Sequence, residues 1–142
     1  MRFHHLGLAC SDLELETATL SAVGYSPERE DFVDPHQGVR GRFLTGGGPR
    51  LELLVAMPGS EVLASWTSRG VRIYHIAYEV PSLESALDTL RAEGARVVSH
   101  PAPAVAFDGR SVAFAALKTL QLIELVQAAS PDRPGAGALG GA

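Results

Sequence analysis

The sequence predicts an α+β fold built from two βαβββ modules. The main evidence is an internal repeat, in which residues 5–25 align with residues 75–95 at a constant offset of seventy and without a gap. In this alignment His5 matches His75. Because a repeat constrains architecture more firmly than local propensity does, we expect the two halves of the chain to share one topology.

Each copy of the repeat carries the same local signals: an apolar run led by His, a Ser-containing turn, and an amphipathic segment that ends at Gly. In the second copy, Ser82 is the predicted N-cap of a helix, and Leu83 and Leu87 recur at helical spacing. Gly94 is the predicted stop. The pattern indicates a strand, a turn and a helix in that order.

The first copy predicts the same elements. Either Ser11 or Asp12 is expected to cap the helix, and a glycine again follows its last turn. The apolar face of this helix is expected to hold Leu13, Leu20 and Val23.

A second observation supporting two modules is the pattern of strands after each helix. Further strands are predicted at 39–44, 51–55, 95–99, 111–115 and 120–126. The run GGGP at 46–49 reads as a hairpin turn. The last strands of the halves, LELLV and LIELV, match with Glu52 opposite Glu124. We therefore expect one domain over 1–129, with module one at about 1–57, module two at about 71–129, and a flexible tail at 130–142.

Composition excludes several functional classes. The chain has 142 residues, 12 Lys and Arg against 16 Asp and Glu, and a net charge of −4, which argues against nucleic acid as a partner. No apolar run is long enough for a membrane span, and no leader is evident, so we expect a cytoplasmic protein without membrane contact. Cys10 is the single cysteine, so it forms no intrachain disulfide and is expected to be buried and inert.

The repeat also duplicates one His and one Glu. Glu52 and Glu124 lie inside apolar strands, where a carboxylate is costly to bury unless it is paired or bound to a metal. Because strand side chains alternate, we expect Glu52 on the face opposite its neighbours Leu51 and Leu53. Two imidazoles and two carboxylates suit one divalent ion of Co, Zn, Ni, Mn or Fe.

Several segments resemble one protein family along residues 3–127. They are HHLGLACSDLE, QGVRGRFL, RLELL, YHIAYEVPSLESALDTLRAEGARVV and LIELVQ. The chain resembles the vicinal oxygen chelate superfamily, which includes glyoxalases, dioxygenases and bleomycin-resistance proteins, and within it the methylmalonyl-CoA epimerases. The resemblance implies a curved mixed sheet around a metal cleft, and it implies the metal ligands His5, Glu52, His75 and Glu124.

The resemblance further implies a metal-dependent isomerase that removes a proton alpha to a carbonyl through a metal-stabilised enolate. We expect Glu124 to be the principal acid and base, and Glu52 to be a ligand and second base. The expected substrate is a small molecule such as an acyl-CoA or a carrier-bound thioester. The resemblance also implies a homodimer.

Four alternatives remain open. A glyoxalase I-type lyase is favoured by the His, Glu, His, Glu set, and a dioxygenase would use His5, His75 and Glu124 alone. The apolar segment 115–120 is compatible with a natural-product biosynthetic tailoring enzyme. A metal-free ligand-sequestering resistance protein belongs to another class.

Smaller expectations concern residues beside this set. His4 neighbours His5 and is expected on the opposite face of its strand, in a structural or surface role. His36 and His100 adjoin prolines and are expected to be solvated in loops. For Arg40, Arg42 and Arg110, surface charge is favoured over contact with an anionic substrate. For Trp66, Tyr74 and Tyr78, core or rim packing is favoured over ligand stacking.

Overall fold

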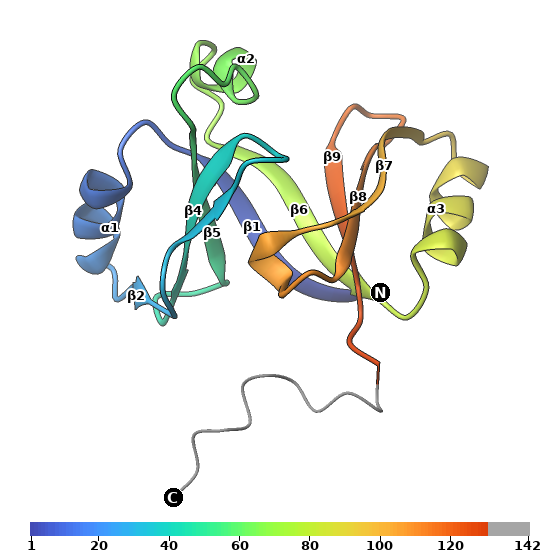
Figure 1. Cartoon of the computed structure of the whole chain (residues 1–142), viewed down its shortest axis with the longest axis horizontal. Helices are drawn as coiled ribbons and strands as arrows, with labels where there is room; N and C mark the ends of the chain where they lie inside the picture. Colours follow the sequence, from blue (N-terminus) through green and yellow to red (C-terminus); the bar gives the residue numbers. More distant parts are fainter. Residues whose placement is uncertain (131–142) are drawn as a thin grey trace, which may run out of the picture.

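Nine strands form one continuous mixed sheet in the computed structural model, which describes residues 1–130 (Figure 1). The strands are β1 (Arg2–Ala9), β2 (Ser26–Pro27), β3 (Phe32–Asp34), β4 (Val39–Thr45), β5 (Leu51–Ala56), β6 (Ile73–Val80), β7 (Arg96–Pro103), β8 (Ser111–Ala116) and β9 (Leu122–Gln127). The helices are α1 (Leu13–Ser21), α2 (Ala64–Thr67), α3 (Leu83–Ala92) and the short 3₁₀ turn η1 (Val105–Phe107). The predicted tail lies outside the described residues except for Ser130.

The sheet confirms the α+β fold of two related modules. Its strand order is β2-β4-β5-β1-β6-β9-β8-β7, and β3 pairs with β4. In each module the first strand runs parallel to the last, β1 with β5 and β6 with β9. Antiparallel pairing of β1 with β6 joins the modules, with Leu6 opposite Ile76. These two residues are equivalent in the repeat, so the modules are related by an approximate twofold axis through this pair.

Each main helix begins and ends as the repeat predicts. Asp12, rather than Ser11, caps α1 by accepting a hydrogen bond from the backbone N–H of Leu15, and Ser82 caps α3 in the same way. Gly24 and Gly94 follow the helices with φ of 100° and 89°, a conformation that glycine adopts without strain. Within residues 1–130, no helix combines the length and apolar character needed to cross a membrane.

Several details differ from the prediction, which did not include α2 or η1 and ended the strand β7 at residue 99. β2 and β3 were not predicted, because they are short strands that pair only with β4 and have no alternating apolar pattern. Val23 is 63% exposed and does not join the apolar face of α1. β9 begins at Leu122 rather than at Leu120, since Leu120 adopts a left-handed turn conformation with φ of 74°.

The helices α1 and α3 cover one face of the sheet and leave its other face uncovered by them. In Figure 1, α1 and α3 lie at opposite ends of the molecule, with the strands between them. Leu13 of α1 packs with Leu53, and Leu87 of α3 packs with Leu125, in two separate apolar clusters. As predicted, Leu53 therefore lies on the helix side of β5, and Glu52 is left facing the inner side.

Candidate metal centre

Four adjacent central strands place the two His and two Glu residues on one face of the sheet. Two rungs of paired residues carry them: Glu52–Gly7–His75 and His5–Ala77–Glu124. Each rung thus contains one imidazole and one carboxylate separated by a small residue. The four side chains come from both modules of one chain, so this chain completes the cluster without a partner.

The distances within the cluster fit a shared divalent ion. The Nε2 atoms of His5 and His75 are 3.0 Å apart, and each lies 3.5 Å from Oε1 of Glu52. Oε2 of Glu124 lies 3.0 Å from Nε2 of His75 and 3.8 Å from Nε2 of His5. One ligand atom from each residue lies within 4.8 Å of all the others. Atoms that share an ion at about 2.1 Å are about 3 to 4 Å apart, so the donor set fits a metal.

Their charged and polar neighbours make the two carboxylates unlike. Both side chains are about 4% exposed. Burial alone would raise the pKa of Glu52, but the charge and hydrogen bonds of His5 and His75 outweigh it and hold that pKa below its ordinary value. Burial and the charge of Glu52 raise the pKa of Glu124 well above its ordinary value. Without a metal, the cluster therefore favours one ionised and one protonated carboxyl group.

Aromatic rings surround the cluster on both sides. On the His5 side, the ring of Phe107 stacks on the imidazole at a centroid distance of 5.7 Å, and Phe43 meets it edge-on at 5.5 Å. On the His75 side, Tyr74 and Phe114 lie 4.5 and 5.6 Å from the imidazole. These rings exclude water, which strengthens electrostatic interactions within the site. Tyr74 also packs against Trp66, at a ring-centroid distance of 5.6 Å.

A cavity of about 590 Å³ adjoins the His75 side of the cluster. Tyr74 and Phe114 separate the cavity from His75 by a single layer of side chains. Its lining residues are mostly apolar and include no Asp or Glu, whereas Arg96, His36 and His100 contribute positive or neutral groups. His36 and His100 are exposed, as expected, and both border this cavity. His36 lies in the expected loop, whereas His100 lies within β7. The lining suits a partly apolar ligand that carries negative charge.

His4 corrects one prediction from the sequence. The pairing of β1 with β6 has an irregular register between Phe3 and His5, so strict alternation of side chains fails at His4. The Nδ1 atoms of His4 and His5 lie 2.7 Å apart, which places the two imidazoles in direct contact rather than on opposite faces. Burial, together with the charges of His5 and Arg50, lowers the pKa of His4 to about 4.

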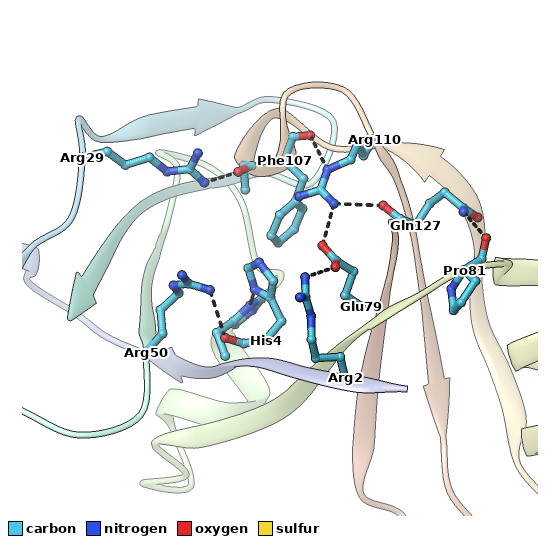
Figure 2. Close-up of polar contacts among 11 residues, drawn as sticks. Arg2, His4, Arg29, Arg50, Glu79, Pro81, Phe107, Arg110 and Gln127 are labelled. Atoms are coloured by element: carbon cyan, nitrogen blue, oxygen red, sulfur yellow. Dashed lines mark hydrogen bonds and ion pairs between the residues drawn. The ribbon is translucent and has the colours of Figure 1, made fainter. Parts of the chain in front are cut away.

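The arginines mostly serve ion pairs. Arg42 binds Asp31 and Glu14 on the side of α1, away from the cluster, and its side chain is 11% exposed rather than a free surface charge. Figure 2 shows Arg110 bound to Glu79 and to the backbone carbonyls of Phe107 and Gln127. This arginine supports the turn that carries Phe107 over His5.

Asp34 also supports this turn, and sequence reasoning did not single it out. Its carboxylate is 2% exposed and accepts hydrogen bonds from the backbone N–H groups of Gln37 and Val105. Arg29 of module one binds the carbonyl oxygen of Ala106 (Figure 2). Both contacts link module one to η1, across more than seventy residues of chain. No signal in the sequence pointed to Asp34, because β3, the short strand that it ends, could not itself be predicted.

Cys10 is buried, as expected, and burial raises the pKa of its thiol. It lies on the helix side of the sheet beside Leu13 and Leu53, away from the cluster.

Comparison with known proteins agrees with this geometry. Residues 4–114 match the glyoxalase/bleomycin resistance protein/dioxygenase superfamily. The chain is 32% identical over 134 residues to an ethylmalonyl-CoA/methylmalonyl-CoA epimerase from Cereibacter sphaeroides, covering 89% of this chain and 97% of the relative.

Solved structures share the fold. Methylmalonyl-CoA epimerase from Mycobacterium tuberculosis superposes with a TM-score of 0.75 at 24% identity, covering 91% of this chain and 89% of that one. A variant of methylmalonyl-CoA epimerase from Streptomyces coelicolor, in complex with 2-nitronate-propionyl-CoA, gives a TM-score of 0.71 at 26% identity. That alignment covers 92% of this chain and 99% of the other.

Proposed function

Because the chain belongs to the glyoxalase/bleomycin resistance protein/dioxygenase superfamily, we propose that it is a metal-dependent epimerase of acyl-CoA thioesters. The observation that carries the proposal is the buried cluster of His5, Glu52, His75 and Glu124. The 32% identity to an ethylmalonyl-CoA/methylmalonyl-CoA epimerase supports an isomerase in particular. A 2-alkylmalonyl-CoA is the substrate class that follows.

The cavity beside the cluster supports a thioester substrate of this kind. Its apolar walls suit an alkyl group or the uncharged part of a thioester arm, and Arg96 offers a positive charge to an anionic group. An acidic lining would repel a carboxylate or phosphate, and none of its lining residues is acidic. The cavity would thus receive the substrate on the His75 side of the cluster, beside the rings of Tyr74 and Phe114.

The four cluster residues would hold the metal, His5 and His75 through their Nε2 atoms and the two glutamates through carboxylate oxygens. A bound divalent cation would supply Lewis-acid stabilisation of the negative charge that develops when the carbon alpha to a carbonyl loses its proton. The surrounding rings of Phe43, Phe107 and Tyr74 keep water from this charge.

Epimerisation needs a proton to leave one face of the alpha carbon and to arrive on the other. Glu52 and Glu124 belong to different modules and are related by the approximate twofold axis, so they approach the cluster from opposite sides of that axis. In this proposal Glu124 is the principal acid and base, and Glu52 serves as a ligand and as the second proton carrier.

The proposal is tested by hydrogen exchange at the alpha carbon. In D₂O, the metal-loaded protein should introduce one deuterium into methylmalonyl-CoA and interconvert its two epimers, as followed by mass spectrometry and chiral analysis. His75→Ala should abolish both readouts. Metal-loaded protein that produces neither exchange nor epimerisation with methylmalonyl-CoA or ethylmalonyl-CoA would contradict the proposal.

A glyoxalase I-type lyase is the second candidate. The observation that favours it is the second carboxylate, since Glu52 Oε1 lies 3.5 Å from both imidazoles and completes a His, Glu, His, Glu set. Turnover of the methylglyoxal–glutathione adduct without exchange of the alpha proton of methylmalonyl-CoA would support this candidate instead.

A further inference from the structure

His4 lies in a bulge of β1 that turns its ring toward the candidate metal centre. Phe3 pairs with Tyr78 and His5 pairs with Ala77, so His4 is an extra residue without a partner on β6. Bulges of this kind redirect a side chain from the direction that alternation would give it. Here the redirected ring contacts His5 through their Nδ1 atoms, 2.7 Å apart.

This contact restricts where His5 carries its proton. A hydrogen bond between two Nδ1 atoms needs one donor and one acceptor. Nε2 of His5 faces the cluster, 3.0 Å from Nε2 of His75 and 3.5 Å from Oε1 of Glu52. To bind a cation through Nε2, His5 must keep that lone pair free and carry its proton on Nδ1, which then donates to His4.

We propose that His4 is a positioning residue, which accepts a hydrogen bond from Nδ1–H of His5 and so holds the His5 ring and its tautomer ready for metal binding. The inference rests on the metal dependence proposed above. His4 touches neither the four ligand atoms of the cluster nor the cavity, so its effect reaches the site only through His5.

The surroundings of His4 hold the acceptor in place. Its ring meets the ring of Phe107 edge-on at 5.3 Å, and its carbonyl oxygen accepts a hydrogen bond from Arg50. Figure 2 shows His4 between Arg50 and Phe107, beneath the turn that Arg110 supports. The backbone and the ring of His4 are therefore both restrained, which favours a hydrogen bond of defined direction.

The second module lacks this arrangement. Tyr74 occupies the position equivalent to His4, and its ring lies 4.5 Å from the imidazole of His75. Among the described residues, Nδ1 of His75 is buried and has no hydrogen-bond partner. A neighbouring acceptor thus orients only one of the two imidazoles, and His5 is the better prepared ligand.

The test compares one substitution that keeps the ring with one that keeps the acceptor. His4→Phe keeps a ring for packing against Phe107 but removes the acceptor, whereas His4→Asn places a carbonyl oxygen where Nδ1 was. Mutating the hydrogen-bond partner of a metal-bound histidine typically lowers metal affinity by about 10–100-fold. His4→Phe should therefore weaken Zn²⁺ or Co²⁺ binding by about that factor. His4→Asn should restore most of the affinity. Tyr78→Phe, which changes a ring packed against the α3 cluster, should keep the wild-type affinity.

Metal affinity would be measured by competition with a chromophoric chelator, and the tautomer of His5 by ¹H–¹⁵N correlation of its imidazole in the Zn²⁺-loaded protein. The expected spectrum has a protonated Nδ1 in the wild type and in His4→Asn. Wild-type affinity in His4→Phe, or equal losses in His4→Phe and His4→Asn, would overturn the role of His4 and leave the epimerase proposal standing. A wild-type protein that binds no divalent metal would overturn both proposals.

Discussion

The imidazole of His75 lies directly over Gly7. A Cβ placed on Gly7 would be 2.2 Å from Cε1 and 2.4 Å from Nε2 of His75, much closer than real contacts allow. Gly7 separates Glu52 from His75 on their shared rung, so the missing side chain makes room for the ring to turn toward the carboxylate. In the equivalent position of module two, Ala77 fits without exposure to solvent.

Gly7→Ala should therefore displace the His75 ring and disrupt the cluster. We expect metal affinity to fall by at least about tenfold and the free energy of unfolding to fall by about 1–3 kcal/mol, as for other overpacked sites. Chelator competition and denaturant titration would measure the two effects. Ala77→Gly is the matched control and should keep the metal affinity, with a cost of roughly 1 kcal/mol from backbone entropy. Wild-type metal affinity in Gly7→Ala would show that the position of the His75 ring does not depend on the missing side chain at Gly7.

Glu124→Gln and Glu52→Gln test the two carboxylates, because each amide keeps the shape but cannot carry the proton. Under the proposed roles, Glu124→Gln should lower kcat for alpha-proton exchange by about 10²–10⁴-fold, the usual contribution of a general acid or base. Glu52→Gln should slow exchange of the alpha proton with solvent when the reaction starts from one epimer more than when it starts from the other. The measurement is deuterium incorporation starting separately from each epimer, with bound metal quantified in every sample. Exchange by Glu124→Gln at the wild-type rate would assign the base to another residue.

Asp34→Ala should destabilise the protein by removing a buried acceptor. The backbone N–H groups of Gln37 and Val105 would lose their partner, at a cost of about 1–3 kcal/mol. Urea denaturation would measure this loss. Asp88→Ala removes an exposed carboxylate from α3 and should change the stability by less than about 0.5 kcal/mol. Equal stabilities for the two variants would mean that the contact between β3 and η1 contributes nothing.

The pair of Asp31 and Arg42 predicts a pH-dependent contribution to stability. The hydrogen bonds from Arg42 to Asp31, 2.7 and 2.8 Å long, lower the pKa of Asp31. A carboxyl group whose pKa is lower in the folded state stabilises the protein at pH values above its unfolded pKa. That contribution is lost as the pH falls through the folded pKa. The pair is partly exposed, so we expect a contribution of about 0.2–1 kcal/mol at neutral pH.

Asp31→Asn provides the comparison for this pair. Unfolding free energies of the wild type and the variant should differ at pH 6–7 and converge as the pH is lowered below 4, and the difference should shrink at high salt. A difference that stays constant over this pH range would show that ionisation of Asp31 does not contribute.

The topology was predictable because the same sequence pattern occurs twice in the chain. The offset of seventy between His5 and His75 aligns strand, cap, helix and glycine stop, and these local signals agree with the tertiary fold. β2 and β3 could not be predicted, because edge strands of two and three residues depend on β4 rather than on their own pattern. Val23 fits the helical period but follows the last turn of α1, where the chain has already turned away from the core.

The sequence by itself determined which residue types recur: one His and one Glu per module, each placed by strand alternation on a face that can be inferred from its apolar neighbours. Only the tertiary structure decided that all four meet, since that depends on the antiparallel pairing of β1 with β6 and on their register. It also decided the contact of His4 with His5, because a bulge breaks the alternation from which sequence reasoning proceeds. Periodicity records which face a residue prefers, whereas register, bulges and close approaches such as His75 over Gly7 arise from strands that are distant in the chain.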